Sequence, residues 1–130
     1  MKLMIVDDHA GVRDMIRQIA AAPGDVVCEC ATGGEAVEKL GDFGPDCVSM
    51  DLQMPGISGL EAVRAIIAAR PATRVVIVSA YDQPELRRAA REAGARGYVA
   101  KDDLDTLKAE LRCPPKPACG NSAAFNDGAR

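Results

Sequence analysis

Asp51 has the most chemically suggestive position in the chain. It follows a short apolar run, residues 47–50, and precedes the turn-forming sequence Leu-Gln-Met-Pro-Gly at residues 52–56. A short apolar run that ends at a turn is typical of a buried parallel strand. Open α/β sheets carry their reacting groups at the carboxyl ends of such strands. We therefore expect Asp51 to lie at the reactive edge of a sheet.

Three other apolar runs end in side chains that could share a site with Asp51. Asp7 and Asp8 follow residues 3–6, Ser79 follows residues 75–78, and Lys101 follows residues 98–100. Parallel strands bring their carboxyl ends to one edge, so these groups should lie close together. Carboxylates suit a hard divalent cation, whereas an amine and a hydroxyl suit phosphoryl oxygens. The pattern predicts a site that holds a divalent metal ion and a phosphoryl group.

The elements that would position these residues alternate five times between apolar runs and helical patterns. The runs are residues 3–6, 26–30, 47–50, 75–78 and 98–100. The 3.6-residue period is clearest over residues 12–19 and 60–67, and weaker over residues 36–40, 86–93 and 104–111. Such alternation predicts a parallel sheet covered by helices. The expected helix boundaries are at Pro23-Gly24, Gly41, Pro71 and Gly94, with a helix start at Asp82.

Length and composition limit the kind of protein. A chain of 130 residues with 48% hydrophobic residues is sufficient for one core, built from aliphatic side chains because only two Phe, two Tyr and no Trp are present. The net charge of −3 argues against direct binding of nucleic acid. No apolar stretch approaches the roughly 20 residues of a membrane span, and no signal peptide is evident, so we expect a cytoplasmic protein.

Cysteines and the carboxyl-terminal segment complete this description. The five cysteines, an odd number, are expected to be free thiols, including Cys113 and Cys119, whose spacing is no standard zinc pattern. From residue 113 the chain becomes rich in proline and small residues, too poor in apolar surface to form a core. We expect one domain over residues 1–112, followed by a tail or linker over residues 113–130 and no output domain.

The chain resembles the receiver domains of bacterial two-component response regulators over residues 2 to about 111. The resemblance rests on Asp7-Asp8, the run from Asp51 to Gly56, Ser79-Ala80, and residues 97–101 ending in Lys101. It implies a flavodoxin-like, doubly wound α/β fold, in which five parallel strands in the order 2-1-3-4-5 have helices on both faces. The strand order comes from the resemblance, because periodicity gives only the alternation.

The resemblance also implies the role of each site residue. Asp51 would be the phosphorylated nucleophile. Mg²⁺ would be bound directly by Asp8, Asp51 and the backbone carbonyl of Gln53, and through water by Asp7. Lys101 would pair with the Asp51 carboxylate before transfer and with the phosphoryl group afterwards.

Three further positions would read out or tune the phosphorylated state. Ser79 would donate its hydroxyl to a phosphoryl oxygen, and Tyr98 would fill the space that the moving loop leaves. Gln53 and Tyr81 would flank the approach of the hydrolytic water, so a bulky Tyr81 should slow hydrolysis.

The implied function is a phosphorylation-dependent signalling switch. A histidine kinase or phosphotransfer protein would phosphorylate Asp51, and the changed surface around the fourth helix, fifth strand and fifth helix would control a partner protein or a homodimer. The chain would catalyse its own phosphorylation and dephosphorylation without being a conventional enzyme. The alternatives are a phosphorylation-independent interaction module and a truncated DNA-binding regulator. A haloacid-dehalogenase-type phosphatase is disfavoured because Gln53 stands where such enzymes have a second aspartate.

Each residue also has a simpler structural interpretation. Asp7-Asp8 could cap the following helix, and Asp51 could serve only its turn. His9 is expected to face solvent rather than bind metal, because an oxygen-rich site suits Mg²⁺ better than an imidazole-seeking metal. Arg87, Arg88 and Arg91 form either a solvated helix face or a docking surface for a partner.

Overall fold

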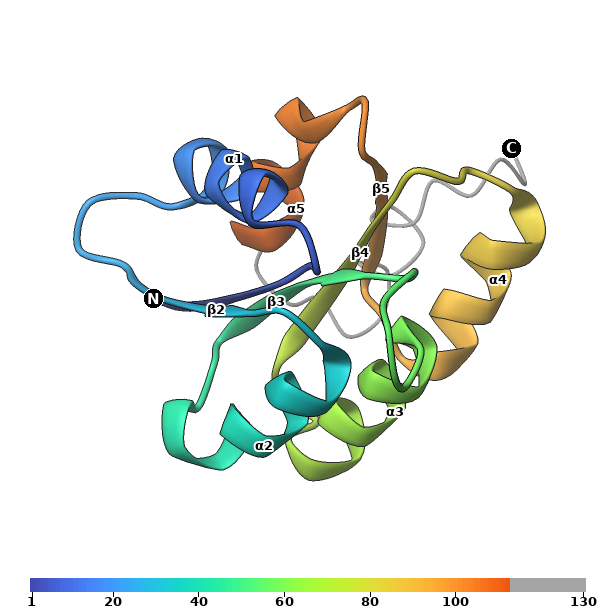
Figure 1. Ribbon diagram of the computed structural model, residues 1–130, viewed down its shortest axis with the longest axis horizontal. Helices are drawn as coiled ribbons and strands as arrows, with labels where there is room; N and C mark the ends of the chain where they lie inside the picture. Colours follow the sequence, from blue (N-terminus) through green and yellow to red (C-terminus); the bar gives the residue numbers. More distant parts are fainter. Residues whose placement is uncertain (113–130) are drawn as a thin grey trace.

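The computed structural model of the chain describes residues 1–112 and contains a single five-stranded sheet with its helices in alternation (Figure 1). In chain order the elements are β1 (Lys2–Val6), α1 (Ala10–Ala20), β2 (Val26–Cys30), α2 (Gly33–Phe43), β3 (Cys47–Asp51), α3 (Gly59–Ala69), β4 (Arg74–Ser79), α4 (Pro84–Ala93), β5 (Gly97–Ala100), the 3-10 helix η1 (Leu104–Thr106) and α5 (Leu107–Arg112). The sequence predictions for residues 113–130, including Cys113 and Cys119, lie outside the described residues.

All neighbouring strands are parallel, and their order across the sheet is β2-β1-β3-β4-β5. Two helical layers enclose this sheet, with α1 and α5 on one face and α2, α3 and α4 on the other (Figure 1). The expected doubly wound fold and strand order are therefore confirmed.

Alternating strand residues supply the two halves of the core. On β1, Met4 and Val6 pack under α2, α3 and α4, whereas Leu3 and Ile5 pack under α1 and α5. All five residues of β3 are buried, because that strand lies in the middle of the sheet and is covered on both faces. This double coverage explains why the strands appear in the sequence as continuous apolar runs.

The helix ends differ from the sequence prediction at two places. Gly41 lies inside α2, which ends instead at Gly44 in the left-handed conformation, with φ of 62°. An exposed glycine is tolerated within the helix, while the C-cap conformation favours glycine. Asp82 does not cap α4: the N-cap is Gln83, and the Asp82 carboxylate accepts a hydrogen bond from the side chain of Arg87.

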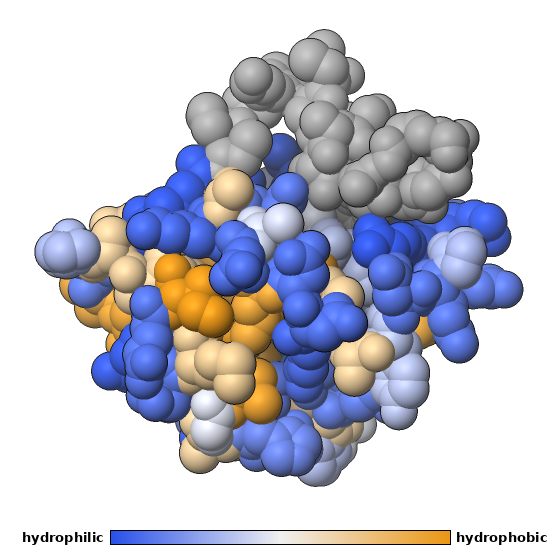
Figure 2. All heavy atoms as spheres, turned by 90° about the horizontal axis from the view of Figure 1, so that it is seen from above, coloured by the Kyte–Doolittle hydropathy of each residue, from blue (hydrophilic) through white to orange (hydrophobic). Residues whose placement is uncertain are grey.

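The surface is mainly hydrophilic on the side of the molecule drawn in Figure 2, where a limited apolar patch is surrounded by hydrophilic side chains. Within residues 1–112, no helix has both the length and the apolar character that crossing a bilayer requires. Cys28, Cys30 and Cys47 are free thiols, as predicted.

Candidate functional site

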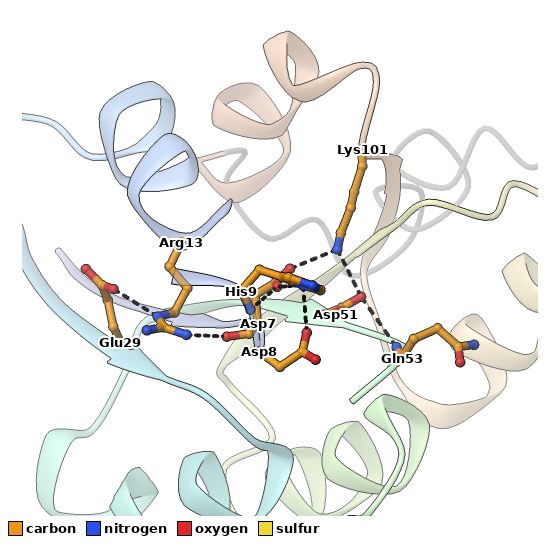
Figure 3. A network of polar contacts seen from close by, with 8 residues as sticks. All are labelled: Asp7, Asp8, His9, Arg13, Glu29, Asp51, Gln53 and Lys101. Carbon is orange, nitrogen blue, oxygen red and sulfur yellow. Dashed lines mark hydrogen bonds and ion pairs between the residues drawn. The ribbon is translucent and has the colours of Figure 1, made fainter. Parts of the chain in front are cut away.

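The carboxyl ends of the strands bring predicted residues together at one edge of the sheet, and Figure 3 shows Asp7, Asp51 and Lys101 there. Asp51 is the last residue of β3, Ser79 is the last of β4, Asp7 follows β1, and Lys101 follows β5. Asp7 and Asp51 are only 1% and 3% exposed, and Ser79 is fully buried. The expected convergence of acid, hydroxyl and amine is present.

Lys101 bridges the two buried carboxylates. Its Nζ lies 3.0 Å from Asp7 Oδ2 and 3.5 Å from Asp51 Oδ1, and its side chain is 23% exposed. The shorter contact is to Asp7, whereas the resemblance implied pairing with Asp51. Lys101 therefore serves as the counter-ion of both acids.

The electrostatics of the site follow from this arrangement. Burial and the neighbouring Asp7 charge raise the pKa of Asp51, although Lys101 and the Gln53 amide act in the opposite direction. Burial alone would lower the pKa of Lys101, but its hydrogen bond to Asp7 and the charges of both carboxylates outweigh burial and raise that pKa. The lysine thus remains a cation at neutral pH.

Asp8 and His9 form the more exposed part of the acidic cluster. One ligand atom from each of Asp7, Asp8 and His9 lies within 4.8 Å of the others. His9 Nδ1 is 3.0 Å from Asp8 Oδ1, and the His9 side chain is 71% exposed, in agreement with its expected solvent-facing position. The N-cap of α1 is His9, so neither aspartate caps that helix.

The oxygen donors of this cluster fit a hard divalent cation such as Mg²⁺. Asp7 Oδ2 is a buried carboxylate oxygen that lies 3.0 Å from the Lys101 ammonium. The Asp8 carboxylate lies beside it and is more accessible. Gln53 is exposed, and its N–H lies 3.4 Å from Asp51 Oδ1. This weak contact within the turn does not account for a buried carboxylate, so a purely structural role of Asp51 in its turn is a poor explanation of its position.

Ser79 and Tyr98 link the site to α4. Ser79 Oγ accepts a hydrogen bond from Tyr81 N–H at 3.0 Å. Tyr98 is buried, and its hydroxyl donates to the Tyr81 carbonyl. The Arg87 guanidinium lies 4.8 Å from the centre of the Tyr98 ring and pairs with Asp82. Tyr98 therefore already occupies an inward position in this structure.

A bracing network near Asp7 was not anticipated from the sequence. Arg13 donates from Nη1 to the Asp7 backbone carbonyl at 2.7 Å and from Nε to Glu29 Oε1 at 3.0 Å (Figure 3). Glu29 also pairs with Arg17. Glu29 reaches this position because β2 pairs with β1 in a register that places it opposite Ile5. Nothing in the spacing of these residues indicates the network.

Gly59 was also missed, although the sequence contains a signal for it. Ser58 and Glu61 form a capping box at the start of α3, a pattern readable as Ser-x-x-Glu. The first residue of that helix lies against the end of β3: a Cβ at Gly59 would be 2.3 Å from the Asp51 carbonyl oxygen. Only glycine allows this close approach beneath Asp51.

Comparison with known proteins gives a consistent family assignment. The sequence model of the response regulator receiver domain family matches residues 3–112 of this chain. The chemotaxis protein CheY of Thermotoga maritima is 36% identical over 101 residues, which cover 77% of this chain and 84% of that protein. A LuxR-family two-component response regulator from Aurantimonas sp. has a crystal structure with 33% identity and a TM-score of 0.77, covering 98% of this chain and 96% of that one.

Several curated relatives are much longer than the matched region. The uncharacterized transcriptional regulatory protein YhcZ of Bacillus subtilis is 39% identical over 104 residues, which cover 78% of this chain but 49% of YhcZ. The chain covers only 32% of a protein-glutamate methylesterase/protein-glutamine glutaminase of Caulobacter vibrioides. The chain thus spans half or less of the length of these relatives.

Proposed function

The chain belongs to the response regulator receiver domain family, and we propose that Asp51 is the residue that accepts the phosphoryl group. Receiver domains of two-component systems act as phosphorylation-dependent switches, and neither an unphosphorylated interaction module nor a DNA-binding role is favoured. The observation that carries the proposal is the position of Asp51 at the end of β3, buried beside Asp7 and 3.5 Å from the Lys101 ammonium.

The chemistry of transfer follows from positioning and charge. The Asp51 carboxylate attacks phosphorus as the bond from phosphorus to the donor breaks, which releases the histidine imidazole of a phosphohistidine or the carboxylate of an acyl phosphate. Lys101 neutralises negative charge on the transferred group. In this proposal the ammonium leaves Asp51 Oδ1 for a phosphoryl oxygen while its contact with Asp7 holds it at the rim. Its raised pKa keeps it protonated throughout. Burial excludes water, which strengthens these charge interactions.

Receiver domains generally bind Mg²⁺ at this acidic pocket. When bound, the ion supplies positive charge to the phosphoryl oxygens. We assign its direct ligands to Asp8, Asp51 and the Gln53 carbonyl, and a water-mediated contact to Asp7. The burial of Asp7, whose carboxylate is already paired with Lys101, and the greater accessibility of the Asp8 carboxylate support that assignment.

The proposed readout runs through Ser79 and Tyr98. Ser79 Oγ uses a lone pair for Tyr81 N–H, and its hydroxyl, which also neighbours the Tyr98 hydroxyl, would turn to donate its proton to a phosphoryl oxygen. A shift of Ser79 would move the Tyr81 backbone, to which the Tyr98 hydroxyl is bonded. Phosphorylation would thereby stabilise the inward Tyr98 and the α4 surface above it.

The rate of dephosphorylation is assigned to Gln53 and Tyr81. Both side chains are exposed beside the acceptor, where they can obstruct water that approaches in line with the phosphorus atom. Tyr81→Ala should therefore shorten the life of the aspartyl phosphate. A decay slower than that of the wild type would contradict this role.

Receiver domains interact with kinases or phosphotransfer proteins and with downstream effectors. For this chain we assign the effector surface to α4, β5 and α5, where Arg88 and Arg91 lie on the exposed side of α4. We also propose that phosphorylation promotes a homodimer through the same surface. The domain is proposed to end at residue 112, and the protein to be cytoplasmic. Self-catalysed phosphorylation and dephosphorylation are the reactions expected of the chain.

Intact-protein mass spectrometry after incubation with acetyl phosphate and Mg²⁺ tests the acceptor. The wild type should gain one phosphoryl group, and Asp51→Asn should gain none. Asp103→Asn, which removes an exposed carboxylate near Lys101, is the matched control and should behave as the wild type. Phosphorylation that persists in Asp51→Asn would place the acceptor elsewhere.

A calorimetric Mg²⁺ titration tests the metal ligands separately. Asp8→Asn should weaken binding more than Asp7→Asn, because Asp8 is assigned direct coordination and Asp7 a water-mediated contact. Equal affinity in the two variants and the wild type would refute the ligand assignment without affecting that of the acceptor.

A further inference from the structure

A pocket with charged and apolar lining residues lies at the opposite edge of the sheet from Asp51. Its volume is about 360 Å³, and its lining residues come from the amino-terminal ends of the strands and the end of α5: Met1, Asp46, Ala72, Arg74, Arg96, Leu111 and Arg112. The parallel strands separate this edge from the phosphoacceptor site by their full length. The pocket is therefore distinct from the site described above.

The lining of this pocket is positively charged. It contains three guanidinium groups, those of Arg74, Arg96 and Arg112, against one carboxylate, that of Asp46. The Asp46 carboxylate already accepts a hydrogen bond from Lys2 N–H at 2.7 Å. Outside the lining, Asp25 pairs with Arg112, and Glu110 interacts electrostatically with Arg74. Within residues 1–112, the Arg96 side chain forms no ion pair.

The side-chain donors of one of these arginines, Arg96, remain available. The structure gives the Arg96 side chain no hydrogen bond or ion pair within residues 1–112, although its backbone N–H donates to the Val75 carbonyl. Arg112 Nε lacks a hydrogen-bond partner in the same part of the chain but is too buried to reach a ligand in the pocket. Guanidinium groups match the paired oxygens of carboxylates and phosphates. The Arg96 guanidinium therefore favours an anionic ligand.

Apolar side chains complete the pocket. Met1, Ala72 and Leu111 line it together with the arginines, and its volume falls at the lower end of the range of small-molecule sites, which begins at roughly 300 Å³. A lone inorganic ion would leave these apolar groups without contacts. The combination suits an organic body attached to one anionic group.

We propose that this pocket binds a small organic anion that carries a phosphate or carboxylate group. The anionic group contacts Arg96, and the organic part lies against Ala72 and Leu111. Leu111 and Arg112, the last two residues of α5, line the pocket, so the bound ligand lies against the end of that helix. The proposal does not depend on phosphorylation of Asp51.

The test uses the full-length ¹⁵N-labelled chain in Mg²⁺-free buffer, titrated separately with phenyl phosphate and with inorganic phosphate. The amides of Ala72, Arg74, Arg96 and Leu111 should shift and saturate, while those of Ser79 and Ala80 at the acceptor edge should not. Phenyl phosphate should bind more tightly than inorganic phosphate. Asp51→Asn should bind both probes as the wild type does.

Arg96→Met gives the decisive variant because it removes the guanidinium that has no ion pair to lose. Phenyl phosphate affinity should fall about tenfold or more, the loss expected for a hydrogen bond to a charged group. The affinity of Arg96→Lys should lie between those of the wild type and Arg96→Met, since lysine keeps the charge but not the planar, two-pronged set of donors. Arg64→Met, which removes an exposed arginine of α3, is the control and should leave affinity unchanged.

The proposal fails if the shifts concentrate at the acceptor edge, if Arg96→Met binds as tightly as the wild type, or if Arg64→Met loses as much affinity as Arg96→Met. It also fails if neither probe saturates at millimolar concentrations. Equal binding of the two phosphates would reject the organic part of the ligand. The dispersion of the NMR spectrum reports whether each variant remains folded.

Discussion

Gly59→Ala should damage the phosphoacceptor site without adding or removing a polar group. The new Cβ would lie 2.3 Å from the Asp51 carbonyl oxygen and 2.8 Å from the Leu52 Cα. Ordinary contacts of a Cβ begin at 3.4 Å, so the end of β3 and the start of α3 must separate by about 1 Å. Both contacts are with backbone atoms, which cannot rotate away as a side chain would.

Two consequences of this displacement can be measured. Overpacking of this kind should lower the free energy of unfolding by about 1–3 kcal/mol, as measured by urea denaturation. The same shift moves Asp51 relative to Lys101, and a 1 Å misplacement of a reacting group can cost on the order of 10²-fold in rate. Phosphorylation by acetyl phosphate with Mg²⁺, followed by intact mass, should slow accordingly.

Gly41→Ala is the matched control. Gly41 lies in α2, is exposed, and has nothing within 4 Å of the position of an added Cβ. Alanine there should raise stability by up to about 1 kcal/mol and leave the rate unchanged. If Gly59→Ala is as stable and as rapidly phosphorylated as the wild type, the close approach of α3 to β3 does not constrain the site.

Three more predictions concern charge and buried polar contacts. Lys101→Met removes the counter-ion of two buried carboxylates, so in EDTA it should lower the free energy of unfolding by about 2 kcal/mol, less than for a fully buried pair because Lys101 is 23% exposed. Mg²⁺ should restore part of this loss. Equal urea midpoints for the wild type and Lys101→Met would contradict the bridging role of Lys101. The Ala22 amide, aided by Arg112, lowers the pKa of Asp25 from 3.8 to about 2 despite burial, so the stabilisation that the Asp25 carboxylate gives is present above about pH 4 and is lost as the pH falls through 2. The difference in melting temperature between the wild type and Asp25→Asn should therefore shrink over that pH interval. A difference that grows as the pH falls would contradict the prediction. Thr73→Val should lower the free energy of unfolding, measured by urea denaturation, by about 1–3 kcal/mol, because the buried hydroxyl donates to the Pro45 carbonyl at 2.9 Å. Thr106→Val, which removes an exposed hydroxyl, should lower it by less. Similar losses in the two variants would contradict a larger contribution from the buried hydrogen bond.

The fold was predictable from the sequence because burial dictates the pattern. Each central strand is covered on both faces, so residues 47–50 are all apolar or small, and Asp51 stands out at the strand end. Periodicity could not give the strand order, which depends on contacts between distant segments. The order came from the resemblance to receiver domains and agrees with the observed topology.

Local signals failed where a glycine or an aspartate had more than one possible role. Gly41 and Gly44 are both near the end of α2, and only the left-handed backbone at Gly44 distinguishes the true end. Asp82 has the chemistry of an N-cap, yet its carboxylate pairs with Arg87, which also lies over Tyr98. Tertiary contacts decided that case.

The candidate site was predictable to the level of which residues meet, and no further. Strand-end position placed Asp7, Asp51, Ser79 and Lys101 together, because parallel strands share an edge. The preference of Lys101 for Asp7 over Asp51 depends on side-chain geometry that spacing does not encode. The Arg13–Glu29 brace depends on the register between β1 and β2.

The positions in the sheet of Asp51 and Lys101, the two residues proposed to take part in phosphoryl transfer, also bear on how the switch should respond to local unfolding. Asp51 ends β3, which is hydrogen-bonded on both sides, whereas Lys101 follows β5, a four-residue strand at the sheet edge with only β4 as a neighbour. Amide hydrogen exchange should therefore be slowest in β3 and much faster in β5. Fraying of β5 would withdraw the ammonium from an otherwise intact acceptor pocket, so transient opening of one edge strand could limit phosphorylation while the rest of the domain stays folded. A partner that covers that edge would raise reactivity by suppressing a motion, without contacting the carboxylate.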